Sequence, residues 1–235
     1  RASHVPAGED GDFFSETAAN RVRDALDDNH VHFDNLGFTA PAWRNATSIY
    51  DCSDHGGCDA GWANTTYIKL PAPQYICDSD ASIRLIVGHE LFHHVQYEAG
   101  MRSSKWTTAF SEGTARAMQD QVYTDIDGTA GLADGCCGYS PDVDNYLNDT
   151  NRNLFSSDVS YQSALFWKYA TEQFGAWAPE PNLGTDFIVR LIQNSDEVSS
   201  DLEDLVETTI NDTHPGRDLE GVFLDFSIAN IAKEF

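Results

Sequence analysis

The segment from Asp80 to Gly100 constrains the fold of this chain more than any other. Its apolar side chains recur three and four residues apart, as on one face of a helix: Ile83, Ile86, Val87, Leu91 and Val95. Asp80 is placed to cap the amino end, and Gly100 follows where a left-handed residue commonly ends a helix. The segment predicts one buried helix of about five turns.

The predicted helix carries the sequence His89-Glu90-Leu91-Phe92-His93. Because His89 and His93 are four residues apart, both imidazoles lie on one face and can bind one metal ion. Glu90 is beside the first histidine, where a carboxylate can take a proton from water that the metal activates. A core helix that happens to carry histidines is the alternative, but this spacing favours zinc. We interpret His94 as lying behind the ligands or at the surface.

A third ligand is expected downstream, because a hydrolytic zinc site needs three protein ligands and one open position. Glu112 is the next strong candidate, and eighteen residues separate it from His93. This is enough chain to finish one helix, turn and begin a second. Ser111 would cap the second helix, whose small residues 113–115 would let it approach the first closely. The alternative for Glu112 is an ordinary first-turn glutamate favoured by the helix dipole.

These motifs carry a family resemblance. The H-E-L-F-H motif and the downstream E-G-T-A, preceded by Trp106, resemble the gluzincin metallopeptidases across about residues 80–175. The spacing is similar to that of the aminopeptidase N group, and there are likenesses to bacterial collagenases. The residues after the second histidine do not continue as in metzincins. The resemblance implies one zinc ion, held by His89, His93 and Glu112, with Glu90 as the general base.

A further helix is expected at residues 161–174, with Gly175 after it. Its apolar stripe consists of Leu165, Phe166, Tyr169 and Phe174. In aminopeptidase-type gluzincins a similar helix begins with a tyrosine that hydrogen-bonds the oxyanion of the reaction. Tyr161 is at the matching place, so the resemblance implies an oxyanion-stabilising role for its phenol. If Tyr161 instead packs on the core, Tyr139, Tyr146 and Tyr169 are the next candidates.

The chain departs from its apparent relatives at two places. Thermolysin-like enzymes have an aspartate four residues after the glutamate ligand, but this chain has Arg116, which cannot accept a hydrogen bond. Asp120, one turn further, is the candidate replacement. The G-x-M-E-N motif that recognises a free amino terminus is also missing, and the nearest sequence is Gly61-Trp62-Ala63-Asn64. An endopeptidase is therefore favoured over an aminopeptidase.

The charge of the chain excludes several classes of partner. The sequence has 38 acidic and 14 basic residues, for a net charge of −24. Such a surface repels nucleic acid and anionic membranes. It is typical of a halophilic protein, and an ordinary acidic secreted enzyme is the alternative. No apolar run approaches 18 residues, so no membrane-spanning segment is expected.

The cysteines and glycosylation sequences indicate an exported protein. The five cysteines are Cys52, Cys58, Cys77, Cys136 and Cys137. A disulfide between the first two would close a short loop, and an odd number leaves one outside any pair within the chain. Four N-x-T sequences begin at Asn45, Asn64, Asn148 and Asn211.

The rest of the chain supplies the remaining elements. Residues 16–26 read as an amphipathic helix, and residues 48–50 and 66–70 read as strands. Residues 124–158 read as a long loop over the site. Residues 184–235 read as helices whose core residues are Phe187, Leu191, Leu202, Leu205, Val222, Leu224, Phe226 and Ile231.

The long loop also contains a candidate second metal site. Asp142 and Asp144 are candidate Ca²⁺ ligands, although a solvated acidic loop is the favoured interpretation.

Together these features predict an α+β zincin-like fold. Residues 1–100 would form a sheet lobe including the metal helix, and residues 101–235 a helical lobe carrying Glu112 and Tyr161. The expected function is that of a secreted zinc endopeptidase acting on peptides or proteins. The alternatives are an aminopeptidase and an inactive binding or structural module on the same scaffold.

Overall fold

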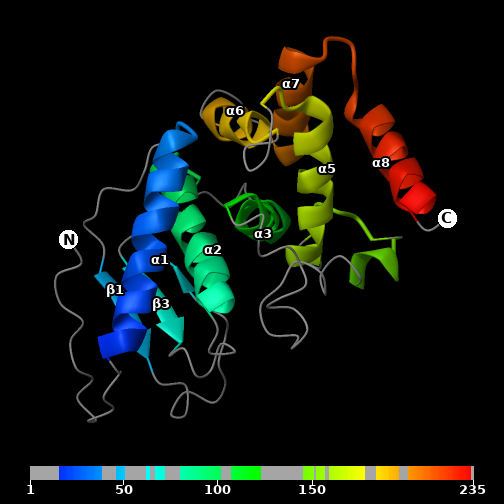
Figure 1. The fold of residues 1–235 in the computed structure, drawn as a ribbon. Helices are drawn as coiled ribbons and strands as arrows, with labels where there is room; N and C mark the ends of the chain where they lie inside the picture. Colours follow the sequence, from blue (N-terminus) through cyan, green and yellow to red (C-terminus); the bar gives the residue numbers. More distant parts are fainter. Residues whose placement is uncertain are drawn as a thin grey trace. The chain divides into compact units, whose positions relative to one another are not determined.

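The chain forms two compact units in a computed structural model. The first unit comprises Arg1–Glu98 and Met118–Pro141, and the second comprises Ala99–Ala117 and Asp142–Phe235. The structure describes residues 16–38, 46–50, 62–63, 67–71, 80–101, 107–122, 145–150, 152–156, 159–177, 184–195 and 201–233. Helices account for most of these residues (Figure 1).

The expected α+β zincin-like class with a sheet lobe is wrong, because the described residues are mostly helical. The strands among them are three short segments, β1 (Ala46–Tyr50), β2 (Trp62–Ala63) and β3 (Tyr67–Pro71). β3 pairs in parallel with β1 and antiparallel with β2. The apolar residues of this chain recur mainly at helical spacing, and most of the buried residues lie on helices.

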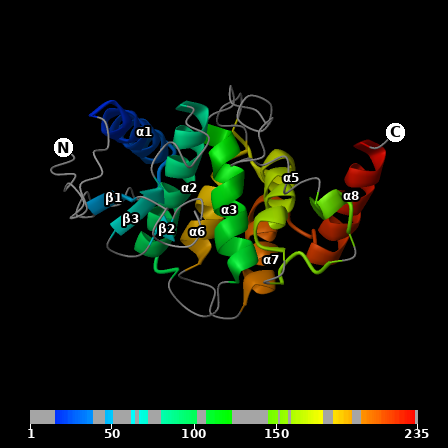
Figure 2. The same ribbon diagram turned by 90° about the horizontal axis from the view of Figure 1, so that it is seen from below.

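Two long helices, α1 (Glu16–Asn35) and α2 (Asp80–Glu98), dominate the first unit. Both views show them side by side (Figures 1 and 2). The ring of Phe33 on α1 meets the ring of Phe92 on α2 edge-on, with centroids 5.5 Å apart. Behind them Gly88 leaves room for Asn29, whose Oδ1 would be 2.8 Å from a β-carbon at position 88. α1 therefore packs directly against the helix that carries the two histidines.

The predicted carboxyl-terminal end of α2 is confirmed, whereas Asp80 is the first residue of the helix and not its cap, and the predicted end of α1 is wrong. Gly100 has φ 78°, the left-handed conformation expected after the helix. α1, however, continues nine residues past the predicted end at Leu26, to Asn35. The extension is held by apolar contacts, because Phe33 and Leu36 are both buried.

The second unit contains the first turns of α3 and the carboxyl-terminal helices. α3 is Thr108–Val122, and the 3-10 helix η4 (Tyr161–Ser163) leads directly into α5 (Ala164–Phe174). The last three helices are α6 (Asp186–Asn194), α7 (Leu202–Thr213) and α8 (Leu219–Lys233). Within this unit Phe166, Trp167 and Phe226 are buried in one aromatic cluster.

Six of the eight core residues predicted for the last helices are buried: Phe187, Leu191, Leu202, Leu205, Val222 and Phe226. The other two are wrong, since Leu224 is 61 % and Ile231 58 % exposed. Both lie on α8, whose apolar residues occupy more than one face, so helical spacing alone does not tell which face is inside.

α7 ends in a turn that is closed by one side chain. The amide nitrogen of Asn211 donates to the backbone oxygens of Glu207 at 3.1 Å and Arg217 at 3.0 Å. Its amide oxygen accepts from the backbone N–H of Gly216 at 3.1 Å, and Gly216 has φ 87°. Asn211 thus satisfies three backbone groups where the helix stops.

The expected loop at 124–158 is interrupted by a helical turn at residues 145–147. The candidate calcium ligands Asp142 and Asp144 and all five cysteines lie outside the described residues. None of the helices in the described ranges combines the length and the hydropathy needed to cross a bilayer.

Candidate metal centre

Helix α2 brings the two histidines of the H-E-L-F-H motif together. The Nε2 atoms of His89 and His93 are 3.1 Å apart, and their rings meet edge-on with centroids 4.7 Å apart. The side chains are 6 % and 7 % exposed. Two Zn–N bonds of about 2.0–2.1 Å at a tetrahedral angle would hold the nitrogens about 3.3 Å apart. The observed separation therefore fits two imidazoles that share one metal ion.

Glu112 completes a group of three. The ligand atoms of His89, His93 and Glu112 all lie within 4.8 Å of one another, and the group could hold a metal ion. Two imidazoles and one carboxylate are the ligand set that zinc takes in hydrolytic sites, where a fourth position stays open. The residues that the sequence singled out thus fit such an ion.

Glu112 lies on α3, which begins earlier than predicted. The hydroxyl of Thr107 accepts a hydrogen bond from the backbone N–H of Phe110 at 3.3 Å, so Thr107 caps the helix. Ser111 is inside the helix and is not its cap, which corrects the sequence prediction. Both residues are typical capping types, and the choice between them needed the position of the first turn.

The remaining residues of the motif divide between the site and the core. Glu90 is 5 % exposed, so its carboxylate is largely shielded from water. Phe92 is part of the core, because its ring packs on Phe33 of α1. His94 is 2 % exposed, with its ring edge-on to Tyr97 at 6.0 Å, so the surface alternative for His94 is wrong.

The sequence prediction missed Gln96. Its Oε1 is 2.9 Å from Nδ1 of His93, and its side chain is 1 % exposed. Ligating histidines in metal sites usually have a hydrogen-bond partner on the second ring nitrogen. The available signal was a glutamine three residues after His93, on the same face of an otherwise apolar helix.

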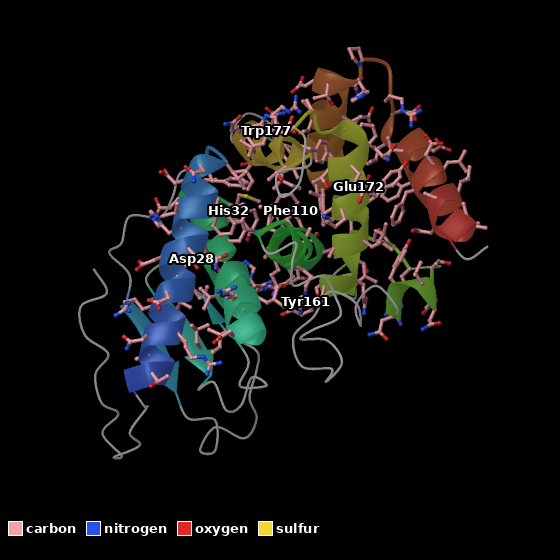
Figure 3. The ribbon with its side chains drawn as sticks, viewed as in Figure 1. Asp28, His32, Phe110, Tyr161, Glu172 and Trp177 are labelled. Carbon is pink, nitrogen blue, oxygen red and sulfur yellow. The ribbon has the colours of Figure 1, made fainter. Side chains whose placement is uncertain are left out.

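In the second unit, Tyr161 of η4 packs against Arg116 of α3. Arg116 follows Glu112 by one turn of α3, and its guanidinium carbon is 4.8 Å from the centre of the Tyr161 ring. Tyr161 is 39 % exposed at the start of η4 (Figure 3). The arginine that replaces the expected aspartate therefore packs against the candidate oxyanion residue through a cation–π contact.

Gly113 allows η4 and α5 to approach α3. A β-carbon at this position would be 1.9 Å from Oγ of Ser163 and 2.8 Å from Nε1 of Trp167. The Ser163 hydroxyl hydrogen-bonds the backbone oxygens of Ala109 at 2.5 Å and Ser160 at 2.7 Å. In the second unit, this glycine sets how closely the Tyr161 segment packs on the helix of Glu112.

The other candidate residues fall into two groups. Tyr146 and Tyr169 both contact the ring of Phe226, and burial raises the pKa of both phenols. Their rings are part of the aromatic cluster. Tyr139, Gly61 and Asn64 lie outside the described residues, as does the side chain of Asp120.

Comparison with protein-family models, curated proteins and solved structures gives no match for this chain.

Proposed function

We propose that this protein is a zinc-dependent peptidase that uses His89, His93 and Glu112 as metal ligands. The observation that carries the proposal is the 3.1 Å separation of the two histidine Nε2 atoms, with the Glu112 carboxylate in the same group. At this distance the two ring nitrogens can share a proton or can both bind one cation, and the Glu112 carboxylate in the same group favours the cation. A divalent ion bound there would polarise a water molecule and the scissile carbonyl.

Glu90 is the proposed general base. It follows the first ligand directly in α2 and is almost fully buried. A buried carboxylate beside a bound cation can take a proton from the attacking water and pass it to the leaving amine. Exclusion of water strengthens its electrostatic interaction with the reacting groups.

Tyr161 is the proposed donor to the developing oxyanion. Its contact with Arg116 holds its ring near the face of α3 that presents Glu112. The partial exposure of Tyr161 leaves its phenol accessible to a substrate, unlike the buried Tyr146. A donor placed there contributes most when charge develops on the carbonyl oxygen.

The proposed substrate is an unstructured peptide or protein segment cut internally. The net charge of −24 opposes nucleic acid as a substrate. No counterpart of the amino-terminus-binding motif is present in the sequence, which favours an endopeptidase over an aminopeptidase. The cysteines and sequons favour action outside the cell.

The proposal is tested by zinc analysis of the purified protein and by cleavage of a denatured protein, with and without chelator. Glu90→Gln should keep its zinc and lose at least about a hundredfold in cleavage rate. Glu98→Gln is the matched control, because it makes the same change at an exposed end of the same helix. Full activity in Glu90→Gln, or cleavage that survives metal removal, would contradict the proposal. A peptide blocked at its amino terminus separates the endopeptidase from the aminopeptidase.

A further inference from the structure

The buried amide of Gln96 is placed to control one of the two imidazoles. Gln96 follows His93 by three residues, so both side chains lie on one face of α2. The Oε1–Nδ1 distance of 2.9 Å is that of a normal hydrogen bond. An amide oxygen can only accept, so in this pair Nδ1 of His93 carries the proton.

This hydrogen bond decides which ring nitrogen can bind a metal. A neutral imidazole carries one proton, and the proton on Nδ1 leaves the lone pair on Nε2. That lone pair is directed at Nε2 of His89, 3.1 Å away. If the amide were turned round, it would donate to Nδ1, and Nε2 would carry the proton and could not be a ligand. The metal-binding form of His93 therefore requires the acceptor that Gln96 supplies.

The acceptor that Gln96 supplies is a neutral amide oxygen, which suits a buried position better than a carboxylate. A carboxylate is the stronger partner for a ligating histidine, because it raises the basicity of the ring. At 1 % exposure, however, an ionised carboxylate would lose most of its hydration. It would also add to a net charge of −24. An amide fixes the ring without either cost.

We infer that Gln96 is a positioning residue for a divalent metal ion: it holds His93 in the tautomer that presents Nε2. The inference rests on the proposed metal site but not on catalysis. Gln96 does not contact the ion; it acts through His93. Removing its oxygen while keeping its shape should therefore lower metal affinity.

The test compares two substitutions on α2 in the chain of 235 residues. Gln96→Met keeps the length of the side chain and removes the acceptor. Tyr97→Phe is the control: it removes a hydrogen bond from the Tyr97 hydroxyl to the backbone oxygen of Ala63. It leaves the ring that stacks on His93 at a centroid distance of 6.4 Å. Both lose one hydrogen bond near the site, but only the first loses the partner of Nδ1.

The primary measurement is Zn²⁺ affinity, obtained by competition with a chromophoric chelator. Gln96→Met should bind Zn²⁺ about 10–100-fold more weakly than the wild type, and Tyr97→Phe within about twofold. Gln96→Glu retains an acceptor and should recover most of the affinity. In the metal-free proteins, ¹⁵N shifts of His93 should show the Nδ1–H tautomer in the wild type and a shift toward Nε2–H in Gln96→Met.

Each outcome decides the inference. Wild-type affinity in Gln96→Met, or an equal loss in Tyr97→Phe, would assign Gln96 to packing alone and overturn it. An Nε2–H tautomer of His93 in the wild type would also overturn it, as would a wild-type chain that binds no Zn²⁺. If Zn²⁺ binds and Gln96→Met weakens its binding as expected, but no peptide is cleaved, the inference is supported and only the proposed function is contradicted.

Discussion

Replacing Gly113 by alanine should destabilise the protein, although the same change usually stabilises a helix. Position 113 lies inside α3, where alanine is favoured over glycine by about 1 kcal/mol. The added β-carbon would, however, be 1.9 Å from Oγ of Ser163 and 2.8 Å from Nε1 of Trp167. Both neighbours are fully buried, so neither can swing into solvent.

The magnitude follows from what has to move. Overpacking a tight contact costs about 1–3 kcal/mol. Displacing Ser163 weakens its hydrogen bonds to Ala109 and Ser160, at about 1–3 kcal/mol for a buried group left unsatisfied. After the gain in helix propensity, the free energy of unfolding should fall by about 1–5 kcal/mol.

The assay is urea unfolding at fixed salt, followed by tryptophan fluorescence. Gly221→Ala on α8 is the control, because its β-carbon would meet only the exposed Asp218 carboxylate, at 2.9 Å. That variant should stay within about 1 kcal/mol of the wild type. Combining Gly113→Ala with Ser163→Ala removes the closest clash and should recover part of the loss. Wild-type or higher stability in Gly113→Ala alone would refute this account of the contact.

Three further predictions concern catalysis, salt and pH. Tyr161→Phe should lower kcat by about 10²–10³-fold, or about 2.7–4 kcal/mol, with zinc content unchanged; a near-normal kcat would assign the tyrosine to packing. Because screening weakens repulsion within a chain of net charge −24, the melting temperature should rise from low to molar salt, and a flat curve would remove the halophilic interpretation. Burial lowers the pKa of His32 from 6.5, so its contribution to stability is present above that value and is lost as the pH falls below it. His32→Leu should therefore lose less stability than the wild type as the pH falls below 6.5, measured by denaturant unfolding; an equal loss in both proteins would contradict this.

The length of α1 shows where sequence periodicity fails. The apolar stripe that includes Val22 and Leu26 meets the polar Asn29 at its next position, and the predicted helix ends before it. Asn29 is nevertheless fully buried, and its amide donates to the backbone oxygen of Ala25 at 2.8 Å. The stripe then resumes at Phe33. A polar residue whose amide nitrogen donates to the preceding turn interrupts the apolar pattern without interrupting the helix.

The metal ligands were easier to predict than the residues that position them. His89 and His93 needed only the geometry of one helix, which local sequence determines. Gln96 was missed even though it obeys the same spacing, because glutamine on a helix is ordinarily a surface residue. The contact between Gly113 and Ser163 joins residues fifty positions apart. A local sequence pattern does not reveal which distant residue packs against a glycine.

The hydrogen bonds that close the turn after α7 use the nitrogen of Asn211 that a glycan would modify. The sequence Asn211-Asp212-Thr213 is an acceptor for N-linked glycans. In the folded chain the nitrogen that would receive the glycan donates to two backbone oxygens, those of Glu207 and Arg217. A glycan would replace one of the two hydrogens on that nitrogen, so modification would remove at least one of these two hydrogen bonds. In an exporting cell that glycosylates, a sugar at Asn211 would therefore weaken the closure of the turn.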